Sequence, residues 1–373
     1  MHKHLHIVCL DVPFPVDYGG VFDLFYKITA LHQQGIKIHL HCFDYGRGEQ
    51  DELNKYCTEV FYYKRMRGLK GFSLRLPYIV SSRRNDNLLT NLLRNNYPVL
   101  LEGIHCTYYL DKNKLRGKKV FVRLHNVEFE YYKQLAKSEI SFFRKIYFLL
   151  ESRLLKRYEE NISSKATFIA VTLKDIEVYK KEFKATEIKY LPVFLPYTSI
   201  NSKEGKGNYC LYHGNLGVAE NEKAATWLLK NVFNELSISL IIAGKNPSKK
   251  LSWLARQNTN VSLIANPSEK EMNELINKAQ INILPSFNST GIKIKLLNAI
   301  FNGRHCIVNA ASVAEPGLEE VCCIAGDSNS FKKNIVSLFD RLFTNEDIAI
   351  RKRLLLQLYN NELNARQLIQ WIC

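Results

Sequence analysis

The chain has 373 residues, too many for one ordinary domain core, so we expect two domains of roughly 150–200 residues each. Hydrophobic residues make up 46% and aromatic residues 12% of the sequence, which suffices for real cores and excludes a disordered chain. The net charge is +16, with 32 basic against 21 acidic residues in 1–197 and 20 against 15 in the remainder. This balance favours an anionic partner, which can be nucleic acid, an acidic membrane face or a phosphorylated substrate.

The apolar runs and the cysteines bear on the compartment. The longest apolar runs, such as 98–101 and 147–150, are far shorter than the roughly 20 residues of a membrane span. The first run, 5–10, leads directly into Asp11 and predicts a β-strand rather than a cleavable signal. The nine cysteines are an odd number without a C-x-x-C pair, which argues against disulfides and metal sites. We therefore expect a cytoplasmic protein.

Short apolar strands alternate with longer amphipathic stretches along the chain, a rhythm typical of parallel α/β folds. In the first half we predict strands at 5–10, 37–43, 59–63, 99–102, 119–124, 167–171 and 188–191, and helices near 21–34, 85–95, 139–161 and 173–184. In the second half we predict strands at 209–213, 239–243, 261–264, 281–284, 305–308 and 322–325, and helices near 220–234, 269–278, 293–302 and 328–343. The last segment, 348–373, is also predicted as helix.

The domain boundary is predicted within 192–208, where two prolines precede a run of Asn, Ser, Lys, Glu and Gly. We assign 1–197 to a first domain and 198–357 to a second. Both are expected to be Rossmann-like and doubly wound. Two such domains facing across a cleft would bind a ligand at the carboxyl ends of their strands.

The first candidate loop, 11–20, lies between the first strand and the following helix. Its paired Gly19 and Gly20 let backbone N–H groups approach an anion, and the positive end of the helix adds to the attraction. The loop is not G-x-G-x-x-G, so a dinucleotide site is poorly supported. An ordinary strand–helix turn is the alternative.

The second candidate is the cluster of Arg123, His125, Asn126 and Glu128 at the end of the fifth strand. Strand ends are where open α/β sheets place their ligands. His125 can hydrogen-bond a sugar hydroxyl or a developing charge. The alternative is a histidine that packs below the cleft with its polar atoms satisfied.

The third candidate loop, 286–291, leads into a helix that we expect to begin at about Ile292. Thr290, Gly291 and Ile292 form the junction, where free amides and the helix dipole would attract a phosphate. Lys293 and Lys295 are expected in the first turn, where the dipole disfavours cations unless an anion is bound. The alternative is a polar helix start with solvated lysines.

The same helix carries Asn298, which is placed to reach a ribose hydroxyl. A fourth loop, at Gly214 and Asn215, follows the first strand of the second half, and Lys245 follows the next strand. A glycine permits close approach of a phosphate, and the lysine supplies positive charge. Three loops that are suited to binding phosphate at one edge of one sheet indicate a phosphate site more strongly together than each loop does alone.

Two segments interleave basic with apolar side chains, at 64–75 and at 142–157. This pattern suits an anionic membrane surface or a lipid-linked acceptor. In the second segment, a core-facing helix with solvated lysines and arginines fits the spacing equally. Nucleic-acid binding is disfavoured, because no recognisable binding module accompanies the charge.

At these loops the sequence resembles glycosyltransferases of the GT-B fold, specifically retaining family 4, the glycosyl transferases group 1. The stretch from Gly291 to Gly303 matches in spacing the family's pattern Gly-x-Arg/Lys-x-Lys-x-Leu-Glu-Ala-x-x-x-Gly. Gly214 lies in a stretch similar to Phe-x-Gly-x-Leu, Lys245 follows a strand ending in Ala-Gly, and Asn266 lies in the counterpart of the base-binding loop. In the first half, 125–128 is similar to the acceptor-side histidine motif and 19–20 to the glycine loop.

The resemblance implies transfer of a hexose, with retention, from a nucleotide-diphosphate sugar to a saccharide or lipid-linked acceptor in cell-surface polysaccharide synthesis. It implies that Lys293 and Lys295 stabilise the leaving diphosphate and that His125 positions the sugar or assists the reacting hydroxyl. A metal is not expected, since the chain has no Asp-x-Asp motif, and the donor is the only small molecule required. The final helix, about 358–373, is expected to return to the first domain, and peripheral contact with the inner face of a membrane is expected from the basic segments.

Two departures from the family pattern leave other functions open. The glutamate that holds the ribose is Asn298 here, and an uncharged amide binds hydroxyls more weakly. The basic pair that grips the diphosphate is absent, with Asn221 and Lys223 standing nearby. A ligand-binding relative without catalysis and a nucleotide-sugar epimerase of the same fold are therefore the alternatives.

Overall fold

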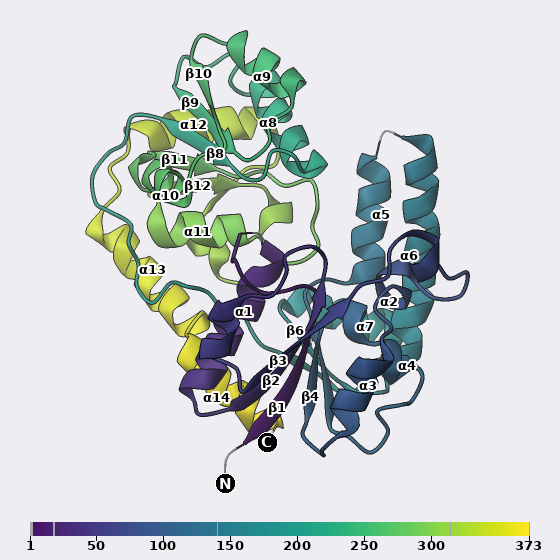
Figure 1. The fold of residues 1–373 in the computed structure, drawn as a ribbon. Coiled ribbons are helices and arrows are strands. Elements are labelled where there is room, and N and C mark those ends of the chain that lie inside the picture. The colour runs from purple at the N-terminus through teal and green to yellow at the C-terminus, as the bar shows by residue number, and fades with distance from the viewer. Residues whose placement is uncertain (1–2, 18, 140, 314, 373) are drawn as a thin grey trace. The chain divides into compact units, whose positions relative to one another are not determined.

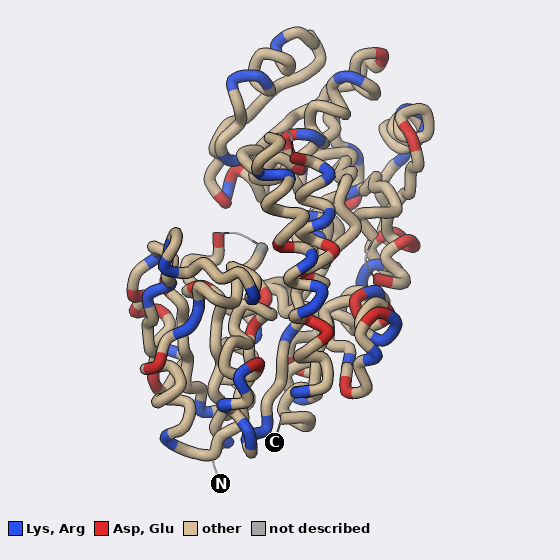
Figure 2. Tube along the Cα trace, turned by 90° about the vertical axis from the view of Figure 1, so that its right-hand side faces the viewer, with Lys and Arg blue, Asp and Glu red and all other residues tan. Residues whose placement is uncertain are grey.

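The computed structural model describes residues 3–17, 19–139, 141–313 and 315–372. Residues Met1–Pro196 with Tyr359–Cys373 form one compact unit, and Tyr197–Leu358 form another (Figure 1). Each unit is a parallel sheet covered by helices. Lys and Arg are spread over both units (Figure 2). Among the described residues, no helix is both long and apolar enough to cross a bilayer.

The sheet of the first unit is wholly parallel, in the order β3-β2-β1-β4-β5-β6-β7. Its strands are β1 (His4–Cys9), β2 (Lys37–Asp44), β3 (Glu59–Lys64), β4 (Val99–Glu102), β5 (Val120–Leu124), β6 (Thr167–Ala170) and β7 (Ile188–Tyr190). Its helices are α1 (Gly19–Gln33), α2 (Tyr78–Ser81), α3 (Asp86–Leu93), α4 (Tyr108–Asp111), α5 (Glu128–Ser138), α6 (Phe142–Ile162), α7 (Leu173–Phe183) and α14 (Asn361–Ile372). The strand order reverses between β1 and β4, which is where doubly wound sheets bind ligands.

Strands of the first sheet carry buried apolar residues on both faces, because helices cover both sides of it. Successive residues of a strand point to opposite faces, so Val8 and Leu101 join one core while Ile7 and Leu100 join the other. Leu368 of α14 is buried in the second of these cores, against α1. Helix α14 therefore covers the same face of the first sheet as α1.

The second unit repeats the arrangement, with the parallel order β10-β9-β8-β11-β12-β13. Its strands are β8 (Cys210–His213), β9 (Leu240–Gly244), β10 (Val261–Ala265), β11 (Ile281–Ile283), β12 (His305–Val308) and β13 (Cys323–Ile324). Its helices are α8 (Ala219–Asn231), α9 (Lys249–Arg256), α10 (Glu269–Lys278), α11 (Ile294–Asn302), α12 (Ser328–Asp340) and α13 (Asn345–Leu358). Ser268 and Glu271 form a capping box that fixes the start of α10.

The predicted fold class, two Rossmann-like α/β units, is confirmed, and strands occur at all the predicted places. Three helix predictions are wrong in detail. The helix predicted near 139–161 is α6 alone, and α5, which precedes it, was not expected. The last segment is two helices, α13 and α14, and α9 was also missed. Helix α11 begins at Ile294 rather than Ile292, because Lys293 is its extended N-cap.

Histidines from β1 and β2 bond one another inside the first unit. His6 Nδ1 lies 2.9 Å from His41 Nε2, and His6 Nε2 lies 2.9 Å from the side-chain oxygen of Asn95. Burial lowers the pKa of His6 from 6.5 to about 4 and that of His41 also falls, since burial disfavours the charged ring. Both rings are therefore neutral in the folded protein at pH 7.

The unfolded chain binds a proton at His6 below pH 6.5, whereas the folded chain does so only below about pH 4. We therefore predict that the free energy of unfolding falls by about 2–3 kcal/mol from this residue alone between pH 6.5 and 4 and is flat in this respect outside that window. Urea unfolding of wild type and His6→Gln at pH 7, 5.5 and 4 isolates the effect. An identical pH dependence in both proteins would contradict it.

Candidate functional site

Four charged side chains meet inside the first unit, beneath the carboxyl ends of β4 and β5. Arg123 of β5 donates from Nε and Nη2 to the two carboxylate oxygens of Asp23, at 3.1 and 3.0 Å. Lys27 Nζ lies 2.9 Å from Asp23 Oδ2 and 2.8 Å from Glu102 Oε1. All four side chains are buried, and their charges cancel. The spacing of four residues places Asp23 and Lys27 on the same face of α1.

The two carboxylates of this cluster remain ionised. Burial opposes the ionisation of Asp23, but the charges of Arg123 and Lys27 outweigh it and hold its pKa well below the usual range. The pKa of Glu102 is also lowered, because Lys27 and then His125 outweigh its burial. The cluster therefore consists of two buried ion pairs at neutral pH.

His125 follows β5 and is held by the carboxylates of the cluster. Its Nε2 lies 3.1 Å from Glu102 Oε2, and its Nδ1 lies 3.9 Å from Asp23 Oδ2. The side chain is 18% exposed, so part of the ring reaches the surface at the carboxyl end of the sheet. A partly exposed imidazole oriented by a carboxylate is equipped to donate to or accept from a bound hydroxyl. His125 is thus not a histidine packed wholly inside the core.

The ligand atoms of Asp23, Glu102 and His125 all lie within 4.8 Å of one another, a spacing that a metal ion would need. Lys27 and Arg123, however, already neutralise the two carboxylates. A divalent cation would have to displace a buried ammonium group and would meet a guanidinium beside it. The donor set therefore suits an internal ion-pair network rather than a metal centre.

Two other members of the predicted cluster after β5, Arg123 and Glu128, have buried side chains. Arg123 was expected among ligand-facing residues, but its guanidinium is buried and also donates to the carbonyl oxygens of Leu191 and Pro192. Glu128 begins α5 and is buried, which raises its pKa to about 7. Gly19 lies at the first position of α1, so the predicted glycine pair is at the start of that helix.

In the second unit, the predicted donor residues lie in loops that follow four neighbouring strands. The loops after β8, β9, β10 and β11 hold Gly214 with Asn215, Lys245, Asn266, and Thr290 with Gly291, Ile292 and Lys293, respectively. In the sheet order β10-β9-β8-β11 these loops share the carboxyl edge. The first three loops bond to one another, through Gly217 N to Lys245 O at 3.2 Å and Asn246 N to Asn266 Oδ1 at 2.8 Å.

The loops after β8 and β9 also approach closely, since a Cβ at Gly244 would collide with the carbonyl oxygen of Gly214. Lys295 of α11 reaches the same region. Its Nζ lies 2.8 Å from Asn221 Oδ1 and 3.4 Å from the hydroxyl of Tyr212. Burial lowers the pKa of Lys295 to about 8, with Glu220 opposing the shift and Lys293 adding to it. The lysine is thus mostly charged at pH 7 but near its point of deprotonation.

The loop before α11 is folded on itself by side-chain bonds. Thr290 donates from its amide and its hydroxyl to Asn288 Oδ1, at 2.9 and 2.8 Å. Lys293 Nζ donates to the carbonyl oxygen of Thr290 at 2.7 Å, so its charge lies over the loop rather than in the first turn of the helix. No side chain of the described residues caps α11. Its first amides remain available to an anion.

The side chain of Asn298 is hydrogen-bonded to Asn302 on the next turn of α11. Asn302 Nδ2 donates to Asn298 Oδ1 at 2.7 Å, and Asn201 Nδ2 donates to Asn302 Oδ1 at 2.9 Å. The side-chain oxygen of Asn298 is therefore already bonded, which leaves its amide group as the part that is suited to a ribose oxygen. Lys245 and Asn266 are exposed, whereas Gly291 is buried.

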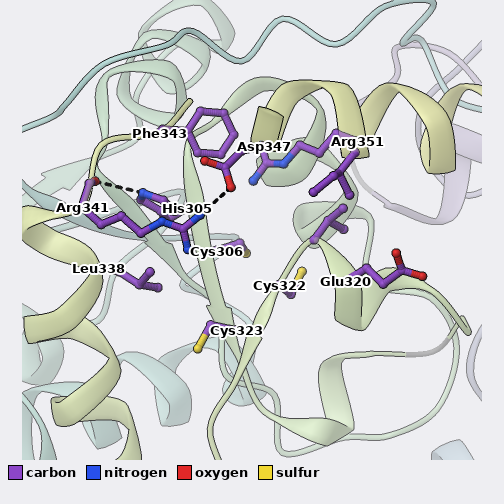
Figure 3. A pocket seen from close by; sticks show the side chains of 12 residues that line it. His305, Cys306, Glu320, Cys322, Cys323, Leu338, Arg341, Phe343, Asp347 and Arg351 are labelled. Carbon is purple, nitrogen blue, oxygen red and sulfur yellow. Dashed lines mark hydrogen bonds and ion pairs between the residues drawn. The ribbon is translucent and has the colours of Figure 1, made fainter. Parts of the chain in front are cut away.

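Another hollow in the second unit, of about 200 Å³, lies at the amino-terminal end of β12 and adjoins α12 and α13 (Figure 3). Its polar groups bond one another. His305 Nε2 donates to the carbonyl oxygen of Arg341, and Arg341 lies 2.7 Å from a carboxylate oxygen of Asp347. The loops after β8, β9, β10 and β11 occupy the opposite edge of the sheet, so this pocket is not part of the candidate site.

Several residues of the site were not found from the sequence. Asp23, Lys27 and Glu102 hold His125, and Glu220 accepts a 2.6 Å hydrogen bond from the hydroxyl of Ser286 at the start of the donor loop. A signal for the first three did exist. Two opposite charges lie inside the apolar pattern of α1, and a glutamate ends the fully buried strand β4.

Replacing Lys27 by Met removes the cation between two buried carboxylates. We predict that Lys27→Met lowers the free energy of unfolding by roughly 3–5 kcal/mol, because it leaves uncompensated buried charge. Lys250→Met, on the exposed side of α9, is the control and is expected to change the stability by less than about 0.5 kcal/mol. Chemical denaturation at pH 7 measures both. Equal stability of the two variants would show that the cluster does not support the first unit.

Comparison with known proteins agrees with this geometry. Residues 207–341, within the second unit, match the family model described as Glycosyl transferases group 1. The chain is 26% identical over 363 residues, 92% of each sequence, to a 44.6 kDa protein in the cps region of Klebsiella pneumoniae. It is similar to a sucrose-phosphate synthase from Thermosynechococcus elongatus, with a TM-score of 0.71, 13% identity and coverage of 99% of this chain and 98% of that one. It is also similar to a UDP-forming α,α-trehalose-phosphate synthase from Burkholderia xenovorans, with a TM-score of 0.67, 10% identity and full coverage of both chains. The chain thus has the GT-B fold, and residues 207–341 of its second unit are similar to the glycosyl transferases group 1.

Proposed function

We propose that this protein transfers a hexose from a nucleotide-diphosphate sugar bound at the carboxyl edge of the second sheet. The observation that carries the proposal lies at the uncapped start of α11, where Lys293 folds over the preceding loop and Lys295 reaches Asn221, which lies against Gly214. Backbone amides and two cations at one point suit a diphosphate. They would stabilise the charge that develops on the leaving group, which is the main electrostatic task of such a transfer.

His125 is the proposed contact to the sugar or to the reacting hydroxyl. Glu102 fixes the orientation of its ring, and Lys27 keeps that glutamate ionised. No side-chain nucleophile or metal is part of the proposal, and transfer with retention follows from the family resemblance. Holding the reactants in the correct geometry and stabilising charge then supply the rate.

We further propose that the acceptor is a saccharide or a lipid-linked intermediate of cell-surface polysaccharide synthesis. The support is the relative from a cps region and the basic character of the first unit. A lipid-linked acceptor would place the reaction at a membrane surface. The competing candidate, a ligand-binding relative without catalysis, is favoured by one observation, the engagement of Asn298 Oδ1 by Asn302.

A thermal-shift screen against UDP- and GDP-sugars identifies the donor, and donor turnover with and without acceptor then measures activity. We predict that His125→Ala and Lys295→Met each lower kcat/KM by about 100-fold, because each removes a group that stabilises or orients the transition state. Lys250→Met, on the exposed side of α9, is the matched control and keeps full activity. Full activity in both site variants would overturn the proposal, whereas donor binding without turnover in wild type would favour the non-catalytic candidate.

The pKa of Lys295 predicts a pH dependence of donor binding. Above its pKa of about 8 the free protein must take up a proton at Lys295 to bind the anion, so affinity falls as pH rises. We expect the Kd for the nucleoside diphosphate to rise about tenfold from pH 7.5 to 9 in wild type. Lys295→Arg should show no such rise, because an arginine remains charged. Calorimetric titration at four pH values measures both, and parallel curves would contradict the role of Lys295.

A further inference from the structure

Large apolar side chains lie exposed on two segments of the first unit, and we call them together the apolar–basic surface. Its apolar members are Leu69, Phe72 and Leu74 in residues 68–76, and Phe142, Phe143, Ile146, Tyr147, Leu149 and Leu150 in the first half of α6. Exposure reaches 90% for Leu69, 82% for Leu74 and 83% for Phe143. The core-facing alternative for 142–157 is therefore wrong for the first half of that helix. Apolar exposure on this scale marks an interaction site.

The two segments of the surface lie side by side. The amide of Tyr78, just after 68–76, donates to Glu151 Oε2 of α6 at 2.8 Å. Arg65, just before 68–76, places its guanidinium over the ring of Tyr78 at 5.4 Å. Figure 1 shows α2, which begins at Tyr78, against α6. The apolar side chains of both segments therefore belong to one surface.

The charge of this surface is almost entirely positive. Residues 64–84 contain seven Lys and Arg, of which Arg83 is buried, and no Asp or Glu. Residues 142–157 contain five Lys and Arg with Glu151 as the one acid, and Glu139, just before α6, pairs with Arg144 at 3.2 Å. Glu151 is buried under the bond to Tyr78, so it does not offset the exposed cations. A second copy of this chain would bring the same positive charge to the contact. A lipid bilayer with anionic headgroups and an apolar interior complements both the charge and the apolar side chains of this surface.

We propose that the apolar–basic surface docks on an anionic lipid bilayer, with Phe142, Phe143 and Leu69 entering the interface and the lysines and arginines at the headgroups. One helix, α5, separates the loop that holds His125 from the apolar–basic surface. Helix α5 begins three residues after His125, and its 11 residues rise about 16 Å toward the start of α6. On the proposed function, docking here would bring a lipid-linked acceptor near His125, although docking itself requires no transfer activity.

Flotation of the full chain with vesicles tests the proposal. Wild type is expected to float with vesicles of phosphatidylcholine and phosphatidylglycerol (7:3) and not with phosphatidylcholine alone. Phe142→Ser/Phe143→Ser and Lys70→Glu/Lys145→Glu should weaken binding to the anionic vesicles, by roughly fivefold for each basic charge removed and more for each one reversed. The matched controls lie on α9 of the second unit, Trp253→Ser and Lys249→Glu/Lys250→Glu, and should bind as wild type does.

Thermal melting and nucleotide-sugar binding of every variant separate docking from folding and from the proposed function, since neither is expected to change. The proposal would be overturned if the wild-type protein did not float with anionic vesicles. It would also be overturned if both surface variants bound these vesicles as strongly as wild type does. A dimer in sedimentation equilibrium that Phe142→Ser/Phe143→Ser dissociates, without vesicle binding, would assign the surface to a second copy of the chain instead.

Discussion

The bidentate ion pair between Arg123 and Asp23 connects most of the first unit. It links β5 to α1, and the remaining donors of Arg123 bind the carbonyl oxygens of 191–192 after β7. Asp23 also accepts from the amide of Phe194, and through Lys27 it reaches Glu102 at the end of β4. Removing water from these charges is costly, and only their mutual pairing offsets that cost. The orientation of His125 depends on this arrangement, because the glutamate that holds the ring is itself held by Lys27.

The features of the second unit that suit an anion lie at one edge of its sheet. Strand order places the loops after β8, β9, β10 and β11 at one edge, and the close approach of Gly244 to Gly214 packs two of them together. Helix α11 then points its uncapped start into the same region, with Lys293 folded over the loop and the half-buried Lys295 bonded to Asn221. An anion is the partner that would satisfy both the amides and the lysines.

Much of this could be predicted from the sequence, because parallel strands buried on both faces are continuous apolar runs. Strand β4, Val99–Glu102, is such a run, and the spacing from Gly291 to Gly303 located helix α11. The partners of Arg123 could not be predicted, since Asp23 lies 100 residues away and nothing local states which charge faces which. The pairing of Asn298 with Asn302, by contrast, joins residues four apart on α11 and was open to prediction from the helical spacing. The exposed half of α6 was ambiguous because core-facing and membrane-facing helices share one apolar spacing.

On the proposed function, the loops of the second unit hold a nucleotide-diphosphate sugar. Hydrogen–deuterium exchange of the full chain, with and without saturating UDP-glucose or GDP-mannose, tests it most directly. We predict that one of these ligands slows exchange in peptides covering 213–217 and 291–296, where backbone amides would bind the diphosphate. Protection confined to the first unit, or a bound nucleotide sugar that leaves both of these segments unchanged, would contradict it.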